Sequence, residues 1–347
     1  MLPKANPKEE LKMIHTFKLM FPLHYQEVQD MQRKLSIIYT QLNSYFDGMY
    51  PGVTMVITNS GNGKWKLYMV IDAIKLLGKP DITEADYKSL ESMIRNILWN
   101  VVGHSAHYKN HTLLRIDYRY DVPIADKDIR MLLMNLYKKQ TEAYRFQKKS
   151  LGKLKDGVFV PYKTTVYHSS KSIESMVYLK QEEREDKGEK VEDYEKDVIR
   201  FEVHVKEDHL YYMEKKNKKA PRPRKLEAYM KADVYKEYFR KYLSQIYHPG
   251  DFYKIDEARN KLKSSSLSAT NKLKLIEFLK QVSSHNIDTP LKNKHKHEGK
   301  NKKMSKGTYN SRLALLQEVG INPVLIPKNY QPKAPSFLKN PLNDFPW

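Results

Sequence analysis

The sequence contains no cysteine, which excludes disulfide bonds, cysteine-ligated zinc and thiol catalysis. It also lacks an apolar run long enough to span a bilayer and a secretory start, so we expect a cytoplasmic protein. Acidic residues are scarce relative to basic ones: 41 Asp and Glu stand against 62 Lys and Arg, a formal net charge of +21. Such a charge attracts polyanions. Nucleic acid is the first candidate partner, and an anionic membrane surface is the second.

The length of 347 residues allows two or three domains. Apolar runs at Val53–Asn59 and Trp65–Asp72 flank Ser60-Gly61-Asn62-Gly63, which is typical of a β-hairpin. Thr83 and Asp126 each precede apolar residues at helical spacing, so each predicts a helix N-cap. Strand-then-helix units favour an α+β fold, with a mixed or antiparallel central sheet and flanking helices, and an α/β sandwich is the alternative.

Two further segments alternate apolar and polar residues with the period of a strand, residues 113–121 and 199–206. Asp117 lies on the polar face of the first, among arginines, and Glu202 lies on the polar face of the second. We expect one buried and one polar face on each strand. The structural interpretation of both carboxylates is pairing with neighbouring arginines.

Residues 169–184 indicate a strand that runs into a polar segment. Tyr178 stands there beside Lys180, Glu182 and Glu183. A tyrosine hydroxyl can attack a phosphodiester when a carboxylate helps to hold a divalent metal and a lysine offsets the phosphate charge. The alternative is an ordinary surface or edge-strand tyrosine, because the chain has 25 tyrosines.

Three short motifs now stand in one order: Arg115-Ile116-Asp117, Tyr178-x-Lys180-x-x-Glu183 and Arg200-Phe201-Glu202. Together they resemble the three motifs of the rolling-circle replication initiators. The filamentous-phage gene II endonucleases and the tyrosine-type initiators of small Gram-positive plasmids are the most similar in pattern. The resemblance covers residues 112–206 and extends more weakly to residues 304–327.

The resemblance implies a role for each matched position. Tyr178 falls where the family has its nicking tyrosine, which forms a 5′-phosphotyrosine bond and leaves a 3′-hydroxyl primer. Asp117 and Glu202 fall on acidic positions associated with Mg²⁺ or Mn²⁺, for which oxygen ligands are suited. Glu183 falls on a third acidic position, although the adjacent Glu182 leaves that register open by one residue. Lys180 takes the basic position between.

The same resemblance and the charge pattern suggest DNA contacts. Ser170 and Lys171 resemble a small-basic pair that precedes the tyrosine strand in the plasmid group. Residues 215–225 form a basic loop that is equally suited to phosphate contacts or to a solvated connection. The expected DNA-binding residues are Arg115, Arg200, Lys171, Lys215, Lys216, Arg222 and Arg224.

The chain departs from many rolling-circle enzymes because it lacks a histidine-hydrophobe-histidine metal motif. His204 is a candidate further ligand or proton carrier, although an exposed strand histidine is more often neither. His104 and His107 lie near His111 in a segment that resembles a loop, where a metal role is the less favoured interpretation. His295 and His297 belong to a Lys-rich linker that we expect to be solvated.

Composition and periodicity suggest four regions: a catalytic nicking domain at 1–210, a basic loop and helical region at 211–269, a helical domain at 270–327 and an irregular tail at 328–347. Thr270 predicts one helix cap, and residues 308–319 predict a helix that ends at Gly320. This smaller helical C-terminal domain is either a helix-turn-helix or winged-helix module for DNA or a helical cap on the sheet.

We therefore expect a metal-dependent DNA nicking and joining enzyme that starts rolling-circle replication on a plasmid or phage origin. Its partners would be double-stranded origin DNA, single-stranded DNA, a host helicase and a polymerase, and no membrane. A DNA-binding regulator without catalysis is one alternative. A tyrosine recombinase or topoisomerase is another, disfavoured because no Arg-rich set with a matching histidine surrounds a late tyrosine.

Overall fold

The computed structural model describes residues 11–61, 63–139, 147–155, 157–244, 246–284, 287–292, 295–297, 300–330 and 334–347. Two compact units interleave along the sequence. The first unit consists of Met1–Tyr120, Lys171–Glu174 and Glu202–Tyr238. The second unit consists of Asp121–Ser170, Ser175–Phe201 and Phe239–Trp347.

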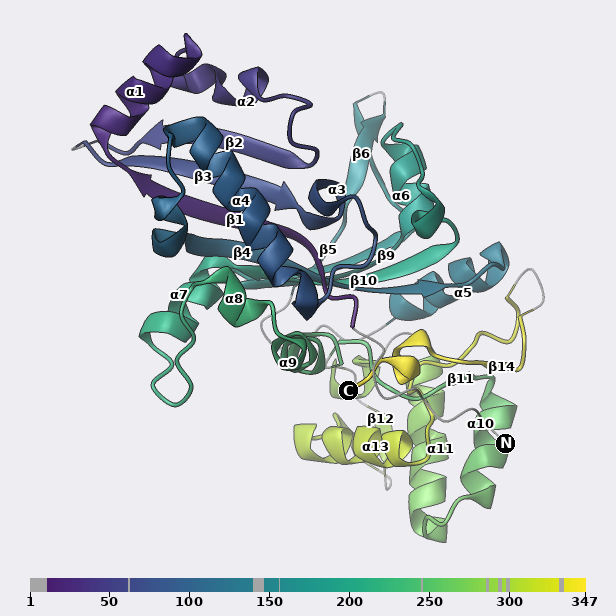
Figure 1. Cartoon of the computed structure of the whole chain (residues 1–347). Helices are drawn as coiled ribbons and strands as arrows, with labels where there is room; N and C mark the ends of the chain where they lie inside the picture. Colours follow the sequence, from purple (N-terminus) through teal and green to yellow (C-terminus); the bar gives the residue numbers. More distant parts are fainter. Residues whose placement is uncertain are drawn as a thin grey trace. The chain divides into compact units, whose positions relative to one another are not determined.

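The fold is α+β, as expected, with an antiparallel central sheet and flanking helices (Figure 1). The sheet has eight strands in the order β2-β3-β1-β4-β10-β9-β8-β5. The bounds of these strands are β1 (Ile14–Leu23), β2 (Val53–Asn59), β3 (Trp65–Asp72), β4 (Thr112–Pro123), β5 (Gln147–Lys149), β8 (Thr165–Ser169), β9 (Ile173–Leu179) and β10 (Val198–Lys206).

The predicted hairpin in the first unit is confirmed with the bounds given by the sequence. Its strands β2 and β3 pair Met55 with Met69 and Ile57 with Leu67, so that apolar side chains share the buried face. Asn62 of the predicted turn lies outside the described residues.

Helices of the first unit pack beside its strands, with α1 and α3 contacting α4, and α3 contacting β1. Thr83 caps η2, the short helix directly before α4, rather than α4 itself, whose N-cap is Asp86; the Asp86 carboxylate accepts from the backbone N–H of Thr83 at 2.8 Å. Gly103 ends α4 with a φ of 83°, a left-handed conformation that favours glycine. The helical elements are α1 (Tyr25–Leu35), η1 (Tyr39–Gln41), α2 (Leu42–Tyr45), α3 (Ala73–Leu77), η2 (Glu84–Asp86), α4 (Tyr87–Val102), η3 (Ala106–Asn110), α7 (Glu207–Lys215) and α8 (Leu226–Tyr229).

Strands β4 and β10 exist as predicted, but their expected exposed polar faces do not. All residues of β10 before Lys206 are buried, and Asp117 and Arg119 of β4 are buried as well. Central strands are covered on both faces, which alternation alone does not reveal. Asp117, Arg119 and the polar residues of β10 before Lys206 are therefore enclosed, whereas Arg115 of β4 stays exposed.

In the second unit, Asp126 caps α5 as predicted by accepting from the backbone N–H of Asp128 and Ile129. Three short strand pairs accompany the main sheet: β6 (Gly152–Lys155) with β7 (Val158–Pro161), β11 (Phe252–Tyr253) with β14 (Phe337–Leu338), and β12 (His295–His297) with β13 (Lys300–Lys302). Its helices are α5 (Lys127–Tyr137), α6 (Lys180–Asp186), η4 (Asp193–Glu195), α10 (Ile255–Ser264), α11 (Ala269–Ser284), α12 (Thr289–Lys292), α13 (Lys306–Glu318) and η5 (Pro341–Asp344), and α9 (Ala232–Tyr242) starts in the first unit.

The C-terminal helices share an apolar core that includes Leu262, Leu279 and Leu316. Two helix starts differ from the prediction. At α11, the side chain of Ser268, rather than that of Thr270, accepts a backbone N–H group. The helix expected at 308–319 is α13, which begins at Lys306, and the side chain of Ser305 accepts the backbone N–H of Thr308. Gly320 follows α13 with a φ of 69°, as expected for a stop.

Two segments expected to be irregular or solvated are partly packed. The acidic stretch 185–197 includes η4, whose Glu195 is fully buried and accepts from Arg184. In the tail, Phe345 is buried and stacks on Phe239 with ring centroids 4.9 Å apart. Among the described residues, no helix combines the length and apolar composition that a bilayer crossing needs.

Candidate functional site

A buried group of ionisable side chains lies on the strands of the first unit. Asp117 comes from β4, and Glu202 and His204 come from β10, with exposed fractions of 2%, 3% and 6%. His204 was expected to be an exposed histidine, and its burial corrects that interpretation. Ionised groups leave water only at a considerable cost in free energy, so each must find partners inside.

His204 joins two carboxylates. Its Nε2 lies 2.8 Å from Glu202 Oε2, and its Nδ1 lies 3.2 Å from Glu174 Oε2. Glu174 also accepts from Lys206 Nζ at 2.9 Å. Both imidazole nitrogens thus face carboxylate oxygens.

His15 adds a second imidazole at an irregular point of the sheet. The pairing of β1 with β4 shifts register between Ile14 and Thr16, so His15 stands at the shift. Irregularities of this kind redirect a side chain. The His15 Nδ1 lies 3.6 Å from Glu202 Oε1, and its Nε2 lies 3.7 Å from Asp72 Oδ2.

The electrostatics follow from burial and contact. Burial acts to raise the pKa of Glu202, but hydrogen bonds from His15 and His204 outweigh it and hold that pKa well below its usual range. Burial acts to lower the pKa of His204, yet Asp117, Glu174 and Glu202 raise it to about 10. The imidazolium of His204 therefore balances carboxylate charge near neutral pH.

Asp117 has an arginine as its close partner. Arg115 donates through Nε to Asp117 Oδ1 at 2.7 Å, which is the pairing that the structural interpretation of the sequence anticipated. Carboxylate oxygens suit a hard divalent cation, whereas the imidazolium of His204 has no lone pair to offer one. In the described parts of the chain, however, only Glu27, His104 and His107 bring three metal-capable ligand atoms within 4.8 Å of one another.

The predicted nucleophile lies in the second unit. Tyr178 is near the end of β9 and is 5% exposed, and Lys180 begins α6 with its Nζ 5.8 Å from the centre of the Tyr178 ring. Burial lowers the pKa of Lys180, with the charge of Arg200 adding to the effect. Lys180 forms ion pairs with Glu183 at 2.8 Å and Glu195 at 3.5 Å.

The two candidates for a third metal ligand each have a cationic partner on or near α6. Glu183 pairs with Lys180 and Lys187, and Glu182 lies 3.5 Å from Arg130. The pKa of Glu183 is lowered, because hydrogen bonds from the two lysines outweigh the effect of burial. Both carboxylates therefore take part in ion pairs.

The expected DNA-binding residues fall into two groups. Arg200 is fully buried and donates twice to Asp121, at 2.7 and 2.8 Å, so it has no surface to offer a DNA strand in this conformation. Arg222 is paired with Glu237 at 2.8 Å, and Arg224 lies 3.4 Å from Glu214.

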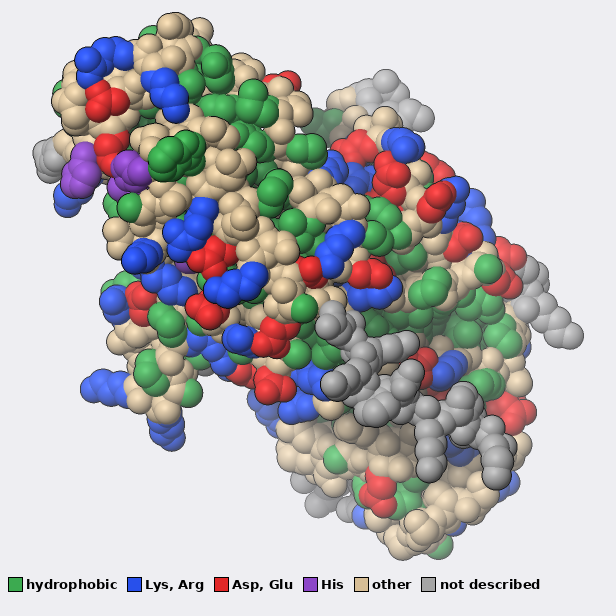
Figure 2. All heavy atoms as spheres, viewed as in Figure 1, with side chains coloured by type: hydrophobic (Ala, Val, Ile, Leu, Met, Phe, Trp, Pro, Cys, Tyr) green, Lys and Arg blue, Asp and Glu red, His purple; other side chains and the backbone are tan. Residues whose placement is uncertain are grey.

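The exposed group consists of three lysines and Arg115, whose side chain is 44% exposed. Lys171 lies 3.2 Å from Asp208 and is almost wholly exposed, and Lys215 at the end of α7 lies 3.3 Å from Glu214. Lys216 lies over the Tyr211 ring at 5.8 Å. On the face drawn in Figure 2, basic and acidic side chains are interspersed.

Sequence reasoning missed Glu174 and His15. Alternation along β9 puts Glu174 on the same face of that strand as Tyr178, four residues later, and this spacing was a usable signal. Nothing in the sequence around His15 marks the register shift that turns it toward Glu202.

No protein-family model matches the sequence, and no curated protein is significantly similar to it. A solved structure of a rolling-circle replication initiator protein from Geobacillus stearothermophilus is similar over 58% of this chain and 76% of that chain, with 8% sequence identity and a TM-score of 0.29. A likeness at this level carries no argument about function.

Proposed function

We propose that this chain is a rolling-circle replication initiator that nicks and rejoins one strand of origin DNA. One observation carries the proposal: Asp117 and Glu202, which the motif resemblance selects as metal-associated, are buried ionisable groups that both act on His204. A buried cluster of this kind is costly, and strongly shifted pKa values gather at functional sites more often than elsewhere.

In the proposed reaction, the phenolic oxygen of Tyr178 attacks the phosphorus of a phosphodiester. A P–O bond to tyrosine forms and the P–O3′ bond breaks, so the segment on the 3′ side of the nick becomes covalently bound through its 5′ phosphate, and the 3′ oxygen of the other segment is released. The phenolic proton leaves to solvent and the 3′ oxygen gains one, so the number of protons is conserved. The reverse attack by a 3′-hydroxyl rejoins the strand.

Divalent magnesium or manganese held by Asp117 and Glu202 would offset the negative charge of the phosphate. Lys180 is the candidate cation from the protein itself, because it is the basic group next to the Tyr178 ring. Its ion pairs with Glu183 and Glu195 fix the position of its ammonium group. Glu182 and Glu183 remain candidates for a third acidic ligand.

Tyr178 is 5% exposed, so we expect its side chain to become more accessible when DNA binds. We therefore expect nicking to be slow. Single-stranded origin DNA needs no melting, so we expect it to be a better substrate than the duplex. We further propose that a host helicase and polymerase extend the 3′-hydroxyl primer. Lys171, Lys215 and Lys216 are the candidate phosphate contacts, because all three lie at the surface.

The test uses a supercoiled plasmid that carries the gene of this protein, with and without Mn²⁺. We expect open circles only with the metal. Covalent capture is the sharper readout: a single-stranded origin oligonucleotide labelled on the 3′ side of the nick should give a shifted band on a denaturing gel. Tyr178→Phe should abolish that band.

Tyr162→Phe serves as the matched control, because Tyr162 lies outside the three motifs and should leave the adduct unchanged. An adduct that persists in Tyr178→Phe would remove Tyr178 from the chemistry. Cutting without any metal would favour the recombinase class, and binding without cutting would favour a regulator.

A further inference from the structure

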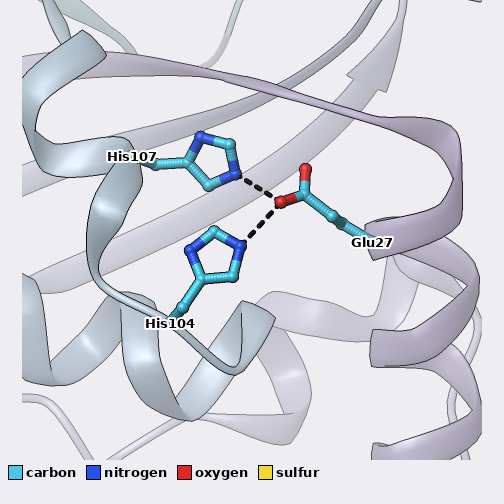
Figure 3. A group of neighbouring side chains, drawn as sticks. All are labelled: Glu27, His104 and His107. Carbon is cyan, nitrogen blue, oxygen red and sulfur yellow. Dashed lines mark hydrogen bonds and ion pairs between the residues drawn. The ribbon is translucent and has the colours of Figure 1, made fainter.

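Two histidines converge on one carboxylate oxygen of a glutamate in the first unit, and none of the three is a motif residue. His104 Nε2 lies 2.8 Å from Glu27 Oε1, and His107 Nε2 lies 2.7 Å from the same oxygen (Figure 3). The two imidazole centroids are 4.8 Å apart. We call Glu27, His104 and His107 the triad.

The local fold explains why these side chains meet. Glu27 stands in the first turn of α1, where its Oε2 accepts from the backbone N–H of His24 at 2.7 Å, so Oε1 is left to face the histidines. Gly103 ends α4 in the left-handed conformation and lets the chain turn back. His104 follows directly, and His107 belongs to η3.

A neighbouring histidine shows what a purely structural imidazole looks like here. The Nδ1 of His111 lies 2.6 Å from the carbonyl oxygen of Tyr108, and its Nε2 accepts from the backbone N–H of Leu226 at 2.9 Å. Burial lowers the pKa of His111 to about 4, so this ring is neutral with both nitrogens engaged by the backbone. His104 and His107 instead direct a ring nitrogen at a carboxylate.

The spacing of the triad suits a metal ion. A tetrahedral zinc with bonds of about 2.0–2.1 Å separates neighbouring ligand atoms by about 3.3 Å. The Nε2 atoms stand 2.7 and 2.8 Å from Glu27 Oε1, so the side chains must part by about half an ångström to admit the ion. Side-chain rotation supplies such a movement without changing the backbone.

We propose that the triad binds one transition-metal ion, with zinc as the preferred species. Two imidazoles and one carboxylate are a donor set that zinc favours over magnesium. His104 has 41% of its side chain exposed, so water can take the fourth position. The ion would tie the start of α1 to the segment that follows α4, and it rests on none of the residues of the proposed nicking reaction.

The orientation of Glu27 supports this assignment. A metal-binding carboxylate is usually held by an outer hydrogen bond, and the His24 backbone N–H supplies one to Oε2. With Oε2 held in this way, the other oxygen, Oε1, faces both imidazoles. An ionised carboxylate is the form that binds a cation.

The experiment titrates the chelator-treated full chain with Zn²⁺ by calorimetry, in excess Mg²⁺ so that carboxylate-only sites are occupied. We expect one zinc per chain and a higher thermal midpoint when zinc is present. Glu27→Gln and His107→Gln should each weaken zinc binding about tenfold or more. Asp30→Asn is the matched control, because Asp30 is an exposed carboxylate on the same helix that contacts Gln26 and Arg33 rather than the two histidines, so this change should leave the affinity unchanged.

Cobalt binding to the wild-type chain gives a second measurement that does not depend on variants folding. Four-coordinate Co²⁺ should produce visible absorption that Zn²⁺ displaces. Failure of the wild-type chain to bind either metal would overturn the proposal and leave the triad as an ion pair. Binding that is equally tight in the two triad variants would overturn it as well.

Discussion

The contact between Glu202 and His204 gives the most demanding prediction, because it separates stability from catalysis. Glu202 Oε2 and His204 Nε2 are 2.8 Å apart, and both side chains are buried. Removing one partner of such a pair costs up to about 3–5 kcal/mol of unfolding free energy when the other is left fully uncompensated. Here His15 still faces Glu202 and Glu174 still faces His204, so the lower part of that range applies. We expect Glu202→Gln and His204→Gln each to lose an amount of this order.

The double variant should lose less than the sum of the two single losses, by about 1–3 kcal/mol, because the contact between the two side chains can be lost only once. The measurement is the free energy of unfolding from urea titrations at pH 7, followed by circular dichroism. The surface pair of Lys12 and Asp81, 2.9 Å apart with exposed fractions of 61% and 44%, is the matched control. The coupling free energy between Lys12 and Asp81, measured in the same way, should be below about 1 kcal/mol.

If the loss of unfolding free energy in the double variant equals the sum of the two single losses within about 0.5 kcal/mol, the reasoning is refuted, because Glu202 and His204 then do not interact. The activity measurement is separate. At a temperature where Glu202→Gln and Asp117→Asn remain folded, both should lose metal-dependent nicking. Retained nicking in either folded variant would remove that residue from the proposed metal site.

Three further predictions concern pH, DNA and a second buried pair. The pKa of His111 is about 4 in the folded chain and 6.5 in the unfolded chain, so its contribution to stability is complete above pH 6.5. About 3 kcal/mol of unfolding free energy is lost as the pH falls toward 4. Urea titrations across this range should show a smaller loss of unfolding free energy in His111→Gln. Replacing Lys215 and Lys216 by glutamine should lower the slope of log affinity against log salt by about 0.9 for each lost phosphate contact, with equal effects on all DNA sequences, whereas an unchanged slope would make them linker residues. Asp121→Asn should cost about 3–5 kcal/mol in unfolding experiments, because the guanidinium of Arg200 stays buried, and a loss below about 1 kcal/mol would show that other groups compensate it.

The elements themselves were largely predictable from local pattern. The turn between two apolar runs predicts the hairpin of β2 and β3, and Thr83 and Asp126 mark helix starts, because these features depend on residues a few positions apart. Cap positions were less certain: Ser268 competes with Thr270 as a start for α11, and only the hydrogen bonds distinguish them. The α+β class followed from the alternation of strands and helices.

The environment of the polar residues was decided by the tertiary structure. Alternation predicts two faces for β4 and β10, but whether a face meets solvent depends on what covers it, so Asp117, Glu202 and His204 were placed outside when they are inside. Arg200 was read as a DNA contact for the same reason, and it is enclosed with Asp121.

Contacts between segments that lie far apart along the chain could not be predicted from the sequence. Glu27 lies 77 residues before His104, and no local pattern links them, so the low rank given to a metal role at His104 and His107 reflected their loop-like surroundings alone. Residue type and short-range spacing are enough to predict the class of fold, the hairpin, several helix starts and the three motifs that resemble the initiators. Only the tertiary structure decided which charges are buried together and which histidines face a carboxylate, because those facts depend on the packing of segments that are remote along the chain.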